Sequence, residues 1–427
     1  MSKKSVKCQT IRKTTKRFSS LLKKKGVRFS LISALFLTIA CYFANNAPIF
    51  TGESTSQLYW TQLFCDFFHI NKTVDYGDVL LYNTSNDKIL VNAYINHDTK
   101  HPEPVGVTPI SDRYKLYKFL KLLSSSDTYK YIILDLAFDK NEVSQYDDSL
   151  YNLIDSMRNI VVATDNKIEI TPKLKNKSAL CSYYITKINT TLTRYEYTRN
   201  DRRSIPMYVF EDLHPKKKMK RYGIGLFSIY KSDGKLCYNS NYLTFDNQLS
   251  VDNKKVKIIF DNGYKPLEYE YLGVYLNQPA SDSIKIKELA TYTDSAIVII
   301  GDFVYDTHDT YMGEKPGPLI MARALQTLEE GKNIVSFFHT FIWFVVFFLI
   351  CYTIYTEKPK RLFLPIIKKI PYKFIRLLLS LLSFSAILFV LSIFEYVRYD
   401  RVYSLVIPIF FFTVLKIYIQ YKQFDEL

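Results

Sequence analysis

Long apolar segments with cationic flanks constrain this chain more than any other feature of its sequence. Residues 334–355 contain no Lys, Arg, Asp or Glu, and apolar stretches with few charges occupy residues 29–44, 374–394 and 402–421. A bilayer core about 30 Å thick needs about 20 helical residues, a length that these segments reach or approach. The sequence therefore predicts four transmembrane helices, at residues 29–46, 334–356, 374–394 and 402–421.

The position of the basic residues along the chain supports a membrane protein. A net charge of +16 would by itself suggest a nucleic-acid partner. However, residues 1–46 contain 11 basic and no acidic residues, residues 47–356 contain 35 basic and 36 acidic residues, and residues 357–427 contain 11 basic and 5 acidic residues. Because the excess lies beside the apolar segments, we expect the lipid bilayer as a partner and no nucleic acid.

Basic residues near the ends of membrane spans also predict the orientation of the chain. Residues 1–28 and the loop 357–373 are both rich in Lys and Arg, which places both segments in the cytoplasm. Residues 47–333 then form an extracytoplasmic domain, and both termini lie inside. We expect a multi-pass protein of the inner or plasma membrane, with its main domain periplasmic or extracellular. The first span could instead be a cleaved signal peptide or end in a lipobox at Cys41, although no A-x-A site follows it.

The first third of the external domain predicts alternating helices and strands. Residues 112–124 have apolar side chains at helical spacing after a capping Ser111 or Asp112, and residues 131–138 form a continuous apolar run typical of a buried strand. A second helix is expected at residues 147–157 and a second strand at residues 159–163. This order favours an α/β fold with a parallel sheet.

The middle of the domain is predicted to be a mixed, β-rich insertion. Between residues 167 and 277, short aromatic strands at 224–230, 242–245 and 256–260 alternate with turn residues. After it, residues 295–300 read as a strand, and Pro318 stands in the first turn of a helix that we expect over residues 319–330. The predicted fold is thus an α/β extracytoplasmic domain with a mixed insertion, plus four transmembrane helices.

Several of these segments resemble the CHASE type 2 family of extracytoplasmic sensory domains. The likeness is carried by IleValIleIleGlyAspPhe at 297–303, AspThrHisAspThrTyrMetGly at 306–313, ProGlyPro at 316–318 and AlaArgAlaLeuGlnThrLeu at 322–328, followed at once by an apolar span. Residues 112–139 are similar to the family's N-terminal half. The resemblance implies an environmental sensor that signals through its membrane helices. Since about seven residues follow the fourth span, the output is expected in a separate protein.

Candidate site residues follow two of the predicted strands. Ligands of open α/β folds bind at the carboxyl ends of the strands, and oxygen and imidazole groups there could bind a polar ligand or a divalent ion. We predict that an extracytoplasmic small-molecule or protein ligand contacts six residues: Asp302, Asp306, His308, Asp309, Asp135 and Asp139. In the structural alternative, Asp302 and Asp309 cap turns and His308 hydrogen-bonds the backbone.

No enzyme motif stands out in the sequence. It contains no GxSxG, Walker A or HExxH pattern, so we expect neither an enzyme nor a cofactor. Two alternatives to the sensor stay open. One is a structural subunit of a membrane complex. The other is a membrane-anchored hydrolase in which Asp302, His308 and Asp309 surround a metal-activated water.

Overall fold

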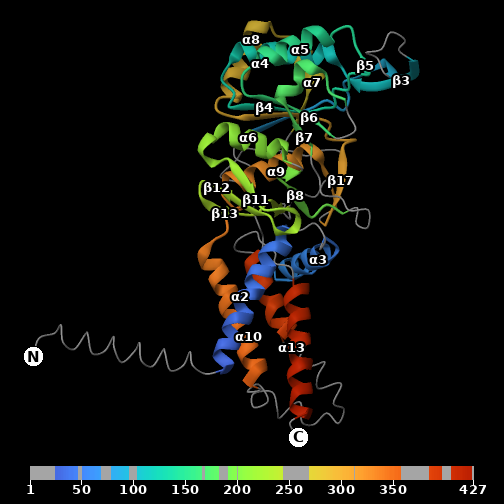
Figure 1. Cartoon of the computed structure of the whole chain (residues 1–427). Helices are drawn as coiled ribbons and strands as arrows, with labels where there is room; N and C mark the ends of the chain where they lie inside the picture. Colours follow the sequence, from blue (N-terminus) through green and yellow to red (C-terminus); the bar gives the residue numbers. More distant parts are fainter. Residues whose placement is uncertain are drawn as a thin grey trace, which may run out of the picture. The chain divides into compact units, whose positions relative to one another are not determined.

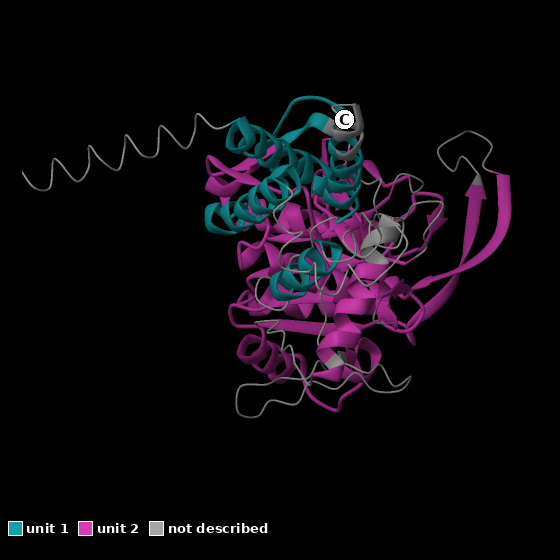
Figure 2. Ribbon diagram, turned by 90° about the horizontal axis from the view of Figure 1, so that it is seen from below, with its two compact units in different colours: residues 1–54, 221–229, 334–427 teal, residues 55–220, 230–333 magenta. Residues whose placement is uncertain are grey.

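The protein is described by a computed structural model that covers residues 25–46, 51–68, 78–95, 103–165, 169–181, 191–199, 201–243, 269–311, 313–356, 384–396 and 405–425. These residues form a mixed α/β structure (Figure 1), which confirms the predicted fold class at that level. The chain divides into two compact units, shown in different colours in Figure 2. The larger unit comprises residues 55–220 and 230–333, and the smaller comprises residues 1–54, 221–229 and 334–427.

A six-stranded parallel sheet lies at the centre of the larger unit. Its strands follow the order β15-β1-β16-β4-β6-β7, and every neighbouring pair is parallel. The strands are β1 Val79–Asn83, β4 Tyr131–Asp135, β6 Ile160–Thr164, β7 Ser178–Leu180, β15 Tyr269–Tyr271 and β16 Ile297–Gly301. β4, β6 and β16 are buried along their whole length, as expected for apolar runs covered on both faces. The predicted parallel sheet is confirmed.

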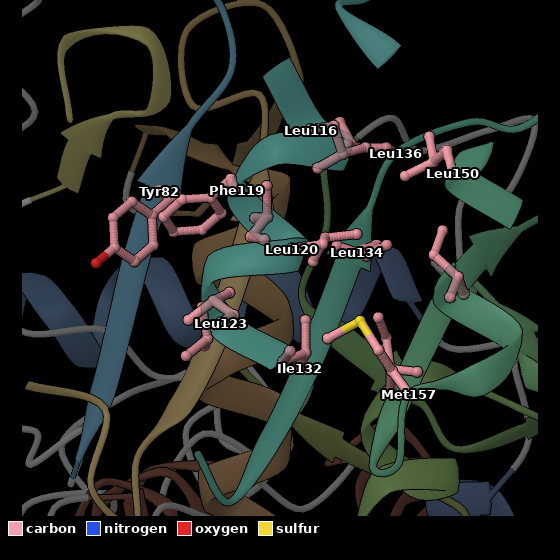
Figure 3. Close-up of a cluster of buried hydrophobic side chains, with 14 of the residues drawn as sticks. Tyr82, Leu116, Phe119, Leu120, Leu123, Ile132, Leu134, Leu136, Leu150 and Met157 are labelled. Carbon is pink, nitrogen blue, oxygen red and sulfur yellow. The ribbon is translucent and has the colours of Figure 1, made fainter. Parts of the chain in front are cut away.

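Helices cover both faces of this sheet (Figure 1). On one face lie α4 Arg113–Ser126, α5 Asp147–Ser156, α7 Leu272–Leu276 and α8 Asp282–Tyr292. Figure 3 shows part of the core between these helices and the strands, with Leu120 of α4 near Leu134 of β4. On the other face lie α6 Ile205–Leu213 and α9 Gly317–Glu329. Successive residues of a strand point to opposite faces of the sheet. Tyr131 of β4 points to this second face, and its hydroxyl donates to Asp212 of α6 at 2.9 Å.

The elements predicted around the sheet begin and end close to the expected residues. Asp112 is the N-cap of α4, and its carboxylate accepts hydrogen bonds from the amides of Tyr114 and Lys115. α5, β6, β16 and α9 match their predicted ranges to within two residues. The predicted strand 131–138 was too long, since β4 ends at Asp135. Leu136 and Phe138 are apolar because they pack into the core from the loop after the strand.

The described residues between 167 and 277 form a mixed, β-rich structure, as predicted. It contains α6, the 3-10 turns Pro172–Lys177, Pro215–Lys217 and Gly225–Phe227, and the strands β8 Arg194–Glu196, β9 Thr198–Arg199, β10 Arg202–Arg203, β11 Met219–Tyr222, β12 Ile229–Ser232, β13 Lys235–Cys237 and β14 Ser240–Tyr242. The predicted strand 224–230 was wrong over most of its length, because Gly225 at φ +59° cannot continue an extended chain. The predicted strand 256–260 lies outside the described residues.

Three features of the described fold were not expected. β7 and β15 are the two edge strands of the central sheet, so the region is not a separate insertion. Outside it, no sequence pattern predicted the antiparallel sheet of β2 Lys88–Ile95, β3 Glu103–Ser111 and β5 Glu142–Val143. The hairpin of β17 Thr307–Thr310 and β18 Gly313–Pro316 was also not predicted.

The smaller unit contains apolar helices. α2 Lys25–Asn46 and α10 Phe337–Thr356 are the two described helices that are long and apolar enough to cross a membrane. The helix Phe384–Tyr396 and residues 406–419 of α13 Val406–Asp425 are apolar but shorter. The basic loop 357–373, the start of the predicted third span at 374–383 and most of the basic N-terminus lie outside the described residues.

α2 and α10 pack side by side in opposite directions. The ring of Phe29, near the start of α2, lies 5.3 Å from the ring of Tyr355, near the end of α10. One buried apolar cluster joins these helices to the other two. It includes Leu37 of α2, Phe347 of α10, Leu388 of the helix Phe384–Tyr396 and Phe412 of α13. A further helix, α3 Thr51–Phe67, follows α2 along the chain.

Candidate functional site

The carboxyl ends of three neighbouring strands meet at one edge of the central sheet. The strand register places Asn83 of β1 opposite Gly301 of β16, and Gly301 opposite Asp135 of β4. The loop after β16, which carries Asp302 and Asp306, begins at the same edge. Asp135 therefore lies near the 302–306 loop, as the two predicted strand ends suggested.

Asp135 is one of two buried carboxyl groups at this edge, with Asp302. Its side chain is close to Cys181, whose thiol donates to Oδ1 over 3.8 Å. Burial raises the pKa of Asp135 well above its ordinary value, and the negative charges of Asp306 and Asp302 raise that pKa further. The hydrogen bond from Cys181 opposes this shift. The environment thus favours a protonated carboxyl, which can both donate and accept hydrogen bonds.

Asp302 has structural partners on both of its oxygens. Oδ1 accepts hydrogen bonds from the amides of Val304 and Tyr305, and Oδ2 lies 2.9 Å from Nζ of Lys88. The carboxylate therefore caps the turn after β16. This is the structural alternative that the sequence offered for Asp302. Lys88, at the start of β2, balances its charge.

The other four predicted site residues, Asp306, His308, Asp309 and Asp139, have different partners. Nε2 of His308 lies 3.1 Å from Oδ1 of Asp306, so these two side chains are neighbours beside Asp135. Asp309 is exposed in β17, opposite Glu314, and its carbonyl accepts from the amide of Leu192. Asp139 accepts from the amide of Asn141 in a turn of its own.

The polar end of β1 belongs to this site and was missed from the sequence. Asn83, Thr84 and Ser85 are all buried, and Asn83 Oδ1 accepts from the amides of Ser85 and Phe303. Within the described residues, Asn83 Nδ2, Thr84 Oγ1, Ser85 Oγ and Asp135 Oδ2 are buried without a hydrogen-bond partner. The sequence signal was the apolar run of residues 79–82 followed directly by Asn, Thr and Ser.

The end of β16 also touches the beginning of α9. A Cβ atom on Gly301 would lie 2.6 Å from Cγ of Pro318 and 3.3 Å from the carbonyl oxygen of Asp135. Only a glycine fits between this carboxyl residue and the first turn of α9. The edge around Asp135 is therefore packed closely against the first turn of α9 through Gly301.

The polar groups at this edge of the sheet suit a small polar ligand. In the part of the chain that the structure describes, no group of three or more His, Cys, Asp or Glu side chains is placed to hold a metal. The edge instead offers an amide, two hydroxyls and a carboxyl with a raised pKa. Buried polar groups without a protein partner are usually satisfied by water or a ligand. Such a set can hydrogen-bond a hydroxyl-rich or amine-bearing molecule.

In comparisons with protein-family models, with curated proteins and with solved structures, nothing matches this chain.

Proposed function

We propose that this protein is a membrane-anchored sensor whose α/β domain binds a small polar ligand outside the cytoplasm and signals to a separate protein. The observation that carries the proposal is the set of buried polar atoms without partners at the ends of β1 and β4. It lies at the edge where open α/β sheets bind ligands. The resemblance of residues 297–328 to CHASE type 2 sensory domains, proposed from the sequence, points to the same role.

The path from the site to the membrane is short along the chain. Gly301 borders Asp135 on one side and Pro318 of α9 on the other. α9 ends at Glu329, and only residues 330–336 connect it to α10, which we propose as the second membrane span. A ligand that binds two arrangements of the edge with different affinity would thereby shift α9 and, through this short link, α10.

The proposed topology has four spans and both termini in the cytoplasm. α2 and α10 provide two antiparallel spans about 30 Å long. The start of α10 contacts the end of the helix Phe384–Tyr396 through His339 and Glu395, as expected for antiparallel second and third spans. α13 would return the chain to the cytoplasm.

Reporter insertions test this topology. The turn at Asp233 and Gly234 joins β12 and β13 and tolerates an insertion because both residues are exposed. Alkaline phosphatase inserted there should be active in a Gram-negative host, and the same enzyme fused after Leu427 should be inactive. The opposite pattern would refute an extracytoplasmic domain.

Ligand binding is tested with the full chain in detergent. A panel of sugars, polyols and amines is screened for compounds that raise the melting temperature. A compound bound at the edge should stabilise the wild type and Asp148→Asn, a variant of an exposed carboxylate, but should lose its effect on Asp135→Asn. A compound that stabilises all three proteins equally would place its binding site elsewhere.

A second candidate function is a subunit of a larger membrane complex. One face of the β2–β3 ribbon exposes Leu90, Val105 and Val107, and the register places Leu90 opposite Pro109 on the same face. Exposed apolar faces of this kind often contact another protein. Purification in mild detergent, followed by light scattering and mass spectrometry, would reveal a stable partner.

A further inference from the structure

Helix α3 exposes its most apolar face. Tyr59, Leu63 and Phe67 follow one another at four-residue intervals, and Trp60 lies beside them on the helix surface. Their exposed fractions are 52% for Tyr59, 60% for Trp60, 40% for Leu63 and 78% for Phe67. These four side chains form the exposed face of α3.

The opposite face of α3 is buried although it is more polar. It consists of Gln57, Leu58, Thr61 and Cys65. The hydroxyl of Thr61 satisfies itself by donating to the carbonyl of Gln57 at 2.7 Å. A helix on the surface of a soluble protein normally buries its apolar side and exposes its polar side. The reversed order indicates that the medium outside the exposed face is not water alone.

The place of α3 in the sequence identifies that medium. Residues 47–50 are the only link between the end of α2 and the start of α3. Four linking residues cannot separate the two helix ends by more than about 18 Å. If α2 crosses the bilayer, α3 begins within this distance of its outer end, where Trp and Tyr concentrate in membrane proteins.

We propose that α3 is an interfacial helix that lies on the outer surface of the membrane and inserts its exposed face between the lipid head groups and the acyl chains. The proposal rests on the proposed function, because it requires α2 to be a span. α3 contains Glu53 and Asp66 and no Lys or Arg, so apolar insertion rather than attraction to anionic lipid holds it there. Neutral phosphatidylcholine is therefore a sufficient partner. Such a helix would fix the start of the sensory domain at the membrane surface.

The two tryptophans of the chain, Trp60 and Trp343, make the proposal directly testable. In the Trp343→Phe variant, Trp60 is the single tryptophan of the full chain. This protein is reconstituted into phosphatidylcholine vesicles that contain lipid brominated either high or deep in the acyl chain. We expect blue-shifted Trp60 emission that is quenched more strongly by the shallow bromines than by the deep ones. If Trp343→Phe folds poorly, the emission and quenching of Trp60 are obtained by subtracting the signal of Trp60→Phe from that of the wild type.

A charged residue on the exposed face should remove this signal. Leu63→Asp in the Trp343→Phe background is expected to lose most of the quenching and to shift the emission to the red. Ile284→Asp places the same charge on an exposed aliphatic residue of α8 and should change neither quantity. A size-exclusion profile equal to that of the parent shows that each variant is folded.

The outcomes separate this proposal from the topology. Water-like emission of Trp60 without quenching, in a chain that resists alkaline extraction from membranes, would overturn the interfacial helix and leave the spans intact. Blue-shifted emission without quenching would also overturn it, since a protein surface would then cover α3. A chain released by alkaline extraction would refute the membrane spans and, with them, this proposal.

Discussion

Gly301 and Pro318 are in such close contact that no side chain fits between them. A Cβ on Gly301 would approach Cγ of Pro318 to 2.6 Å and Cβ of Asp135 to 3.2 Å. This contact joins the end of β16 to the first turn of α9. It is the place where the candidate site and the helix that leads to α10 meet.

Gly301→Ala should destabilise the sensory domain because the first turn of α9 must move away from β16. Overpacking of this kind costs about 1–3 kcal/mol. Chemical denaturation of the full chain in detergent measures the loss, with the half-exposed Val304→Ala from the same loop as the control. An unchanged midpoint for Gly301→Ala would show that α9 adjusts freely, against the proposed coupling.

Asp135→Asn should stabilise the protein at high pH. The folded pKa of Asp135 lies above its unfolded value, so its contribution to stability is present at low pH and falls as the pH rises from the unfolded pKa to the folded one. Asparagine does not titrate, and the variant should exceed the wild type by about 1–3 kcal/mol at pH 8 and by less at pH 4. Thermal unfolding at both pH values measures the difference. Asp148→Asn should show no difference in stability from the wild type. An equal difference between Asp135→Asn and the wild type at both pH values would contradict a raised pKa for Asp135.

Glu196 should make the stability of the domain depend on pH in the neutral range. Burial raises the pKa of Glu196 from 4.5 to about 7, and the charge of Arg199 opposes the shift. The stabilising protonated form is complete below pH 4.5 and is lost as the pH rises through 7, at a cost of about 3 kcal/mol at most. The difference in stability between wild type and Glu196→Gln should therefore grow between pH 5 and pH 8. Glu169→Gln, at an exposed carboxylate, provides the control, and a constant difference would refute the assignment.

The pair of His339 and Glu395 should hold α10 to the helix Phe384–Tyr396. Nδ1 of His339 lies 2.6 Å from Oε2 of Glu395, and both side chains are buried in the apolar unit. Removing one member of a buried pair usually costs about 3–5 kcal/mol, whereas an apolar replacement of both is tolerated. Glu395→Ala should thus lower the melting temperature in detergent, and the double variant His339→Phe/Glu395→Leu should regain most of it. The exposed Phe394→Leu is the control. A double variant as unstable as Glu395→Ala would mean that the pair does not act as a unit.

The local pattern of the sequence predicted three of the six strands of the central sheet, β4, β6 and β16, and three of the helices that cover it, α4, α5 and α9. The apolar runs at 131–138, 159–163 and 295–300 predicted buried parallel strands, because such a sheet needs apolar side chains on both faces, although β4 ends at Asp135. Asp112 predicted the start of α4 because a carboxylate there satisfies free amides of the first turn. β1, β2, β3 and β17 were not predicted, although β2 and β3 are longer than the strands that were.

The candidate site depended on contacts between distant segments. The order of the carboxylates in the sequence placed Asp139 and Asp309 in the same group as Asp135, Asp302 and Asp306. In the structure the charges of Asp302 and Asp306 act on Asp135, whereas Asp139 accepts from the amide of Asn141 and Asp309 lies opposite Glu314 in the hairpin. The register that aligns Asn83, Gly301 and Asp135 joins three parts of the chain more than 150 residues apart at its extremes. Hydrophobic periodicity and capping act within a few residues, so the sequence by itself determined the long apolar helices α2 and α10 and the buried strands β4, β6 and β16. Which polar side chains share a site is decided by strand pairing and burial across the whole domain, and only the tertiary structure supplies these.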